Sequence, residues 1–143
     1  MAEASEISLR LAGADDFGWL DHVAPDLFDE EPTKEFLKTF LAAKGHSLLL
    51  AECDKTVVGK CSAMIHWRPD KPAELYIDEI DVTPEVRKQG IAKQMLAKML
   101  NLADEWDCEE AWVGTEKDNI AARKLYESNG AKAEEFVLYY MEY

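Results

Sequence analysis

The apolar residues of this chain recur with two different periods, and this alternation constrains the fold more than any other feature of the sequence. Between residues 57 and 67 every second position is apolar or glycine, which is the period of a strand with one buried face. Between residues 90 and 106 small and apolar residues recur at helical spacing. Segments of both kinds alternate without a linker, an internal repeat or a low-complexity stretch. The pattern predicts one α/β domain, residues 1–143, built on a mixed sheet.

The expected elements follow from these periods and from the residues that begin and end helices. Asp15, Thr33 and Asp118 stand where helices are expected to begin, and Asn129-Gly130 is a usual end for the last one. We expect helices over residues 15–23, 33–43, 90–106 and 118–129, and strands over residues 7–11, 46–53, 57–67, 74–82 and 110–115, with one or two more within 131–143. This gives a central sheet of six or seven strands with about four helices.

The fourth of these strands, residues 74–82, has a fault in its alternation. Leu75 and Ile77 share one face, whereas Ile80 and Val82 fall on the other. One extra residue at Asp78-Glu79 would return all four apolar side chains to one face, which is what a β-bulge does. The alternative is a strand buried on both faces, for which alternation means little.

The charge of the chain narrows the classes of partner. Its 29 Asp and Glu outnumber its 16 Lys and Arg, so the formal net charge is −13. Nucleic acids and anionic membranes are therefore unfavourable partners, and cationic ligands are favoured. Eight acids with only Lys34 to oppose them gather in one segment: Asp15, Asp16, Asp21, Asp26, Asp29, Glu30, Glu31 and Glu35. The alternative is an acidic surface that serves only solubility.

The turn before the long helix reverses this charge. Arg87, Lys88 and Lys93 surround Gly90 and Ala92, both of which are small. A glycine-containing loop that runs into a helix presents free backbone N–H groups at the positive end of the helix dipole, and these bind phosphate oxygens. A plain helix start with a solvated basic face is the alternative reading of the same residues.

Two motifs in this order resemble those of a known family. Arg87-x-x-Gly90-x-Ala92 is similar to the Arg/Gln-x-x-Gly-x-Gly/Ala motif of the GNAT (Gcn5-related) N-acetyltransferases, and Asn119-x-x-Ala122-x-x-x-Tyr126 resembles their second signature. Within the family, the segments 26–28, 74–80 and 87–92 look most like GNAT-type aminoglycoside 3-N-acetyltransferases. The resemblance covers essentially the whole chain. It implies the GNAT (acyl-CoA N-acyltransferase) fold with a bulged fourth strand, and transfer of an acetyl group from acetyl-CoA to an amine.

The resemblance also implies roles for individual residues. Acetyl-CoA would contact Ile80, Asp81, Val82, Arg87, Lys88, Gln89, Gly90, Ile91, Ala92, Asn119, Ala122 and Tyr126. Glu79 is the first candidate for the base that takes the amine proton, with Asp78 and Asp81 as rivals. The Val82 N–H would stabilise the oxyanion, and Tyr126 would protonate the departing thiolate. Tyr126 could instead be a core aromatic residue, and Asn119 part of a helix cap.

The acids suggest what the acceptor is. Asp26, Asp29, Glu30, Asp78 and Glu79 would form two acidic walls, which favour a polycationic small molecule such as an aminoglycoside. A polyamine, a peptide or a protein N-terminus is the nearest rival. A non-catalytic acetyl-CoA-binding sensor is a second class of function.

The remaining features predict no further chemistry. Three cysteines without CxxC spacing and three scattered histidines predict reduced thiols and no metal site. Residues 1–10 lack the apolar core of a signal peptide, and no apolar run is long enough for a membrane span, so we expect a cytoplasmic protein without membrane partners. The apolar residues 137–141 are a candidate edge for a homodimer.

Overall fold

The computed structural model describes residues 6–143 and contains a five-stranded sheet in the order β1-β2-β3-β4-β5. The strands are β1 (Ile7–Leu11), β2 (His46–Cys53), β3 (Thr56–His66), β4 (Glu74–Val82) and β5 (Glu110–Val113). The helices are α1 (Lys34–Ala42), α2 (Ile91–Glu105) and α3 (Ile120–Ser128), with 3-10 turns η1 (Gly18–Asp21) and η2 (Pro84–Val86). Strands β1 to β4 are antiparallel, and β4 and β5 are parallel, so the sheet is mixed as expected. None of the helices in this part of the chain is both long enough and apolar enough to cross a bilayer.

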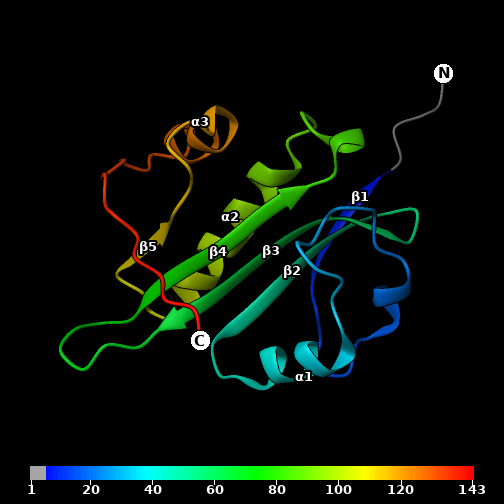
Figure 1. Cartoon of the computed structure of the whole chain (residues 1–143), viewed down its shortest axis with the longest axis horizontal. Helices are drawn as coiled ribbons and strands as arrows, with labels where there is room; N and C mark the ends of the chain where they lie inside the picture. The colour runs from blue at the N-terminus through cyan, green and yellow to red at the C-terminus, as the bar shows by residue number, and fades with distance from the viewer. Residues whose placement is uncertain (1–5) are drawn as a thin grey trace.

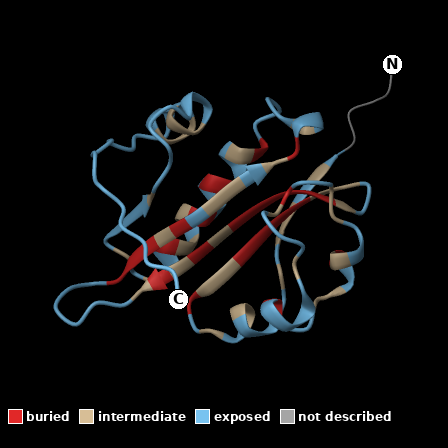
Figure 2. Cartoon of the chain, viewed as in Figure 1, coloured by how far each residue is buried: buried red, intermediate tan, exposed pale blue. Residues whose placement is uncertain are grey.

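The two faces of the sheet are covered differently (Figure 1). Helix α2 lies along one face, where Met95 and Met99 pack in the larger buried cluster together with alternate residues of β2, β3 and β4. Helix α1 and the segment before it cover the other face, where Trp19 and Leu37 pack on the intervening residues of β2. The buried residues therefore follow the middle strands, while β5, α3 and the carboxyl-terminal segment are mostly exposed (Figure 2).

The bulge in β4 is confirmed. Ser62 pairs with Glu79 and Ala63 pairs with Ile77, so Asp78 is the extra residue. Its insertion has the effect that the sequence predicts, because Leu75, Ile77, Ile80 and Val82 all pack in or against the cluster beneath α2.

The prediction of a helix over residues 15–23 is wrong, since only the 3-10 turn η1 forms there. The backbone of the next residues bonds to β3 instead: Val57 N–H donates to the His22 carbonyl (2.7 Å) and Ala24 N–H donates to the Val57 carbonyl (2.9 Å). These bonds straighten the chain where a helix would have continued. Helix α1 begins as expected, with the Thr33 side chain accepting from the Phe36 N–H (3.2 Å).

The prediction of one or two strands within residues 131–143 is also wrong. This segment has no regular structure, and side chains such as Val137 (73% exposed) and Tyr139 (83% exposed) face solvent. A strand needs a neighbour that takes up its backbone hydrogen bonds, and here the sheet ends at β5. Within residues 6–143 the sheet therefore has five strands rather than six or seven, and the chain forms three α-helices rather than four.

Candidate active site

The edge of β4 opens immediately after the bulge. Strand β5 pairs with β4 only from Glu74 to Ile77, and within residues 6–143 no strand pairs with that edge beyond this point. On the other edge, Thr83 N–H donates to the Val58 carbonyl of β3 (2.8 Å). Because antiparallel bonding alternates, the N–H and C=O groups of Ile80 and Val82 point away from β3, toward the open edge. The structure thus presents a short row of backbone donors and acceptors where β4 and β5 part.

The side chain of Arg87 confirms the direction of these backbone groups. Its Nε donates to the Val82 carbonyl oxygen at 3.0 Å. This hydrogen bond joins the basic turn (residues 87–92) to the open edge of β4. Two of the segments expected to bind the cosubstrate are therefore adjacent. Arg87 itself is exposed.

The basic turn ends in a helix start that no side chain of the described residues caps. Gly90 is the N-cap of α2 with φ 77°, and the first helical bond runs from the Gln94 N–H to the Gly90 carbonyl (3.0 Å). The earlier N–H groups of the turn, including those of Ile91 and Ala92, have no partner within the helix. A Cβ built on Gly90 would meet nothing within 4 Å, so the backbone is open to a ligand from this side. Lys88 and Gln89 are exposed beside it.

Tyr126 comes from α3 and lies half-buried against the same cluster as Ile80 and Val82. Burial raises the pKa of its phenol, and the nearby Cys61 and Asp81 raise it further. Tyr126 therefore keeps its proton at neutral pH and is available as a proton donor. Burial also raises the pKa of the Cys61 thiol to about 12, which makes this cysteine a poor nucleophile.

Asn119 has a structural function that the sequence assigned to its neighbour. Its Oδ1 accepts a hydrogen bond from the Ala122 N–H at 3.1 Å, so Asn119, and not Asp118, is the N-cap of α3. Asn119 and Ala122, two of the residues expected to contact acetyl-CoA, are therefore hydrogen-bonded to each other at the start of α3, the helix that carries Tyr126.

The three candidate bases of β4 have different surroundings. Lys60 of β3 is 2% exposed, and its Nζ contacts the Glu79 carboxylate and lies 3.2 Å from that of Asp81. These acids share the sheet face opposite α2. Asp78 instead lies 3.5 Å from the Tyr76 hydroxyl. Glu79 and Asp81 thus belong to one charged cluster, and Asp78 does not.

Lys60 is the site residue that sequence reasoning missed. A cation between Gly59 and Cys61, in a strand of otherwise apolar and small residues, was the available signal. Its ammonium also lies 4.8 Å from the centre of the Phe28 ring, which lies within the acidic segment. The pKa of Lys60 is raised by its bonds to Glu79 and Asp81, which outweigh the opposing effect of burial.

Part of the acidic segment lines a hollow of about 530 Å³. Its lining runs from Leu20 to Pro32 and includes Asp21, Asp26, Asp29, Glu30, Glu31 and Phe28, but no lysine or arginine of the described residues. Phe28 therefore connects this hollow with the Lys60 cluster. Three of the residues expected to bind the acceptor (Asp26, Asp29 and Glu30) meet here.

Other acids are not part of this arrangement. Asp16 pairs with Arg10 of β1. Glu74 is buried at the opposite end of β4, where Arg68 and Lys71 each lie 3.3 Å from its carboxylate. The acidic wall on β4 is therefore limited to residues 78–81.

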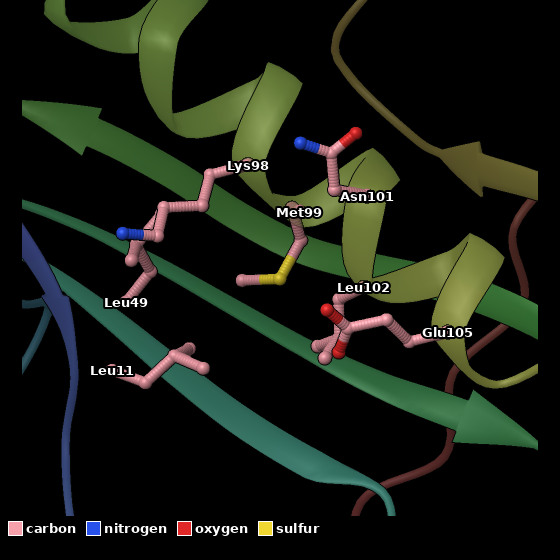
Figure 3. Close-up of a pocket in the computed structure, with 7 residues that line it drawn as sticks. All are labelled: Leu11, Leu49, Lys98, Met99, Asn101, Leu102 and Glu105. Carbon is pink, nitrogen blue, oxygen red and sulfur yellow. The ribbon is translucent and has the colours of Figure 1, made fainter.

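A separate pocket of about 170 Å³ lies between the sheet and α2 (Figure 3). It is lined by Leu11, Leu49, Lys98, Met99, Asn101, Leu102 and Glu105. None of these was expected in the site, and the pocket is a gap at the edge of the core.

Comparison with known proteins gives the family. A description of the acetyltransferase (GNAT) family matches residues 15–131. Human N-acetyltransferase 8 is 28% identical over 115 residues, which are 80% of this chain and 50% of that protein, so the chain spans about half the length of this curated relative.

Two solved structures have the same fold. The aminoglycoside N-acetyltransferase AAC(6')-Iy in complex with CoA superposes with a TM-score of 0.79 and 21% identity, covering 99% of this chain and 98% of that one. A ribosomal-protein-alanine N-acetyltransferase from Brucella melitensis biovar Abortus 2308 superposes with a TM-score of 0.73 and 20% identity, covering 96% and 100%. At these identities the similarity establishes a shared architecture.

Proposed function

The chain belongs to the acetyltransferase (GNAT) family, and from this premise we propose that it transfers the acetyl group of acetyl-CoA to a primary amine of a polycationic small molecule such as an aminoglycoside. One observation carries the proposal: the open edge of β4 is bracketed by Glu79 on one face of the sheet and Tyr126 on the other.

The open edge and the basic turn fit the cosubstrate. The outward N–H and C=O groups of Ile80 pair with an amide of the pantetheine arm, as an added strand would, and the Val82 N–H is left for the acetyl carbonyl. The N–H groups at Gln89, Gly90, Ile91 and Ala92 hold the pyrophosphate, and Arg87 and Lys88 add positive charge. Acetyl-CoA supplies an activated acyl group, and the residues around it direct where that group goes.

The reacting groups then act from opposite sides of the strand. An amine attacks only when neutral, and Glu79 accepts its proton directly or through water. The Val82 N–H donates to the carbonyl oxygen as negative charge develops there. Tyr126, which is protonated at neutral pH, donates its proton to the leaving thiolate, although burial makes it a weaker acid than a free phenol.

The acceptor enters from the face opposite α2. The acids that line the hollow and the acids of the bulge attract cations, and electrostatic focusing raises the rate at which a polycation arrives. The shared fold of an aminoglycoside acetyltransferase agrees with this class of acceptor. The shared fold of a ribosomal-protein-alanine acetyltransferase supports a basic peptide N-terminus as the second candidate.

A thiol-release assay with acetyl-CoA and a panel of aminoglycosides, polyamines, amino acids and basic peptides tests the proposal. We expect release that depends on a polycationic acceptor. The variant Glu79→Gln should lower kcat by about 100-fold, because a general base typically contributes this much, while calorimetry should show unchanged coenzyme A binding.

The matched control is Glu109→Gln, since Glu109 is an exposed acid 4.0 Å from Lys71 at the far end of the sheet. It should keep full activity. Turnover of Glu79→Gln equal to that of the control would remove Glu79 from the role of base. Binding of acetyl-CoA without release for any amine would favour a sensor over an enzyme.

A further inference from the structure

A pair of aromatic rings, one half-buried and one exposed, lies beside the bulge. Tyr76 of β4 and Trp112 of β5 are paired in register, and their ring centroids are 4.3 Å apart with an interplanar angle of 36°. Trp112 is 44% exposed, although β5 pairs with β4 on both sides of this residue. A large aromatic surface in this position is available to a ligand.

The pair lies on the face of the sheet from which the acceptor enters. Leu75 and Ile77 pack beneath α2, so Tyr76 between them points to the opposite face. After the bulge, Glu79 lies on that same face with Lys60. Helix α1 packs on β2, and α2 packs on β4 and β5 from the other side of the sheet.

The charge beside the rings is negative. The Asp78 carboxylate lies 3.5 Å from the Tyr76 hydroxyl. Burial raises the pKa of that phenol, and Asp78 raises it further. Lys60 engages Glu79 and Asp81, but no lysine or arginine of residues 6–143 forms an ion pair with Asp78. Aromatic faces beside such a carboxylate attract an organic cation, because the rings and the acid both favour positive charge.

We propose that Tyr76, Trp112 and Asp78 form a subsite for the acceptor, which rests on the proposed acetyltransferase function. The rings bind the carbon skeleton of the amine, and Asp78 faces a second protonated nitrogen on it. Strand geometry puts Tyr76 roughly 7–10 Å along β4 from Glu79. The subsite therefore selects a diamine or polyamine that carries a ring, with the reacting nitrogen at Glu79.

Two acceptors with the same charge and the same number of bonds between their nitrogens test this proposal: 1,4-bis(aminomethyl)cyclohexane, which has a ring, and 1,6-diaminohexane, which has none. We expect Trp112→Ala to raise KM for the cyclic diamine about tenfold, with less than a twofold change for the linear one and an unchanged kcat. Trp112→Phe should restore most of the affinity for the cyclic diamine.

Trp67→Ala is the matched control. Trp67 is 50% exposed, but it packs on Trp106, at the end of α2, with ring centroids 5.8 Å apart. This control should leave both KM values unchanged. Tryptophan fluorescence gives a second measurement, since the cyclic diamine should change the emission of the wild type and of Trp67→Ala but not that of Trp112→Phe.

The outcomes separate the two proposals. If the wild type acetylates amines and Trp112→Ala changes KM equally for both diamines, the subsite is wrong and the proposed function stands. If no amine is acetylated, both proposals fall. A change in Trp112 emission that follows protein concentration rather than diamine would assign the ring pair to contact between copies, and would also overturn the subsite.

Discussion

Lys60 shows how a single buried charge organises this site. Removing an ammonium from water costs several kcal/mol unless opposite charges compensate for it. Glu79 and Asp81 provide that compensation, and Phe28 adds its ring face. With both acids ionised, the cluster keeps one net negative charge. The charge that an approaching ammonium meets at Glu79 is therefore smaller than the acidic sequence of β4 suggests.

Cys61 makes stability depend on pH in the alkaline range. Burial raises its pKa from the ordinary 9.0 to about 12, so above pH 9 the unfolded thiol loses its proton while the folded thiol keeps it. The unfolded state then binds fewer protons, and the free energy of unfolding falls as pH rises from 9 toward 12. The expected contribution is up to about 1.4 kcal/mol per pH unit.

Urea unfolding of the wild type and of Cys61→Ala at pH 8, 9 and 10 measures this contribution. Lysines and tyrosines titrate in the same range in both proteins, so the difference between the two slopes isolates the thiol. Parallel slopes above pH 9 would show that the Cys61 thiol is no harder to ionise in the folded protein than in the unfolded one.

At the scale of elements, the bulge in β4 determines which side chains meet. It keeps Ile80 and Val82 against the core after Leu75 and Ile77, and it places Glu79 on the sheet face opposite α2. The alternation of apolar residues predicted a bulge at Asp78-Glu79, and the pairing with β3 identified Asp78 as the extra residue. The opening between β4 and β5 was not predictable in the same way, because it depends on β5 ending at Val113.

Deleting Asp78 should therefore destabilise the protein strongly. Without the extra residue, either Ile80 and Val82 leave the core or the pairing of β3 and β4 shifts by one residue. Loss of two partly buried aliphatic side chains predicts a decrease of about 3 kcal/mol or more in the free energy of unfolding.

Chemical denaturation of this deletion variant measures the effect, with Asp78→Ala as the control that keeps the chain length. We expect Asp78→Ala to stay within about 1 kcal/mol of the wild type, because its side chain is exposed. Equal stability of the deletion variant and the control would mean that the bulge does not set the register.

At the scale of the whole molecule, charge is distributed unevenly. The chain carries −13, yet its basic turn sits at the start of α2, while five acids line the hollow over residues 20–32. Anions and cations are thus attracted to different parts of the protein. Salt screens such fields over about 10 Å at 0.1 M.

Salt should consequently slow the capture of a polycation. We expect kcat/KM for a triamine to fall several-fold between about 20 and 200 mM NaCl, with little change in kcat or in the values for a monoamine. Steady-state kinetics across this range measures it. The double variant Asp29→Asn/Glu30→Gln should flatten the dependence, and an unchanged slope would exclude these acids from steering.

The sequence by itself determined the five strands of the sheet, the three α-helices, the bulge and the basic helix start, because periodicity, parity and local turn residues are properties of neighbours along the chain. It misplaced the helix over residues 15–23 and the strands within 131–143, since both depend on whether another segment takes up their backbone hydrogen bonds. Only the tertiary structure joined Lys60 to Glu79, and Tyr76 to Trp112. These contacts join different strands, and their distances are fixed by register across the sheet rather than by spacing in the sequence.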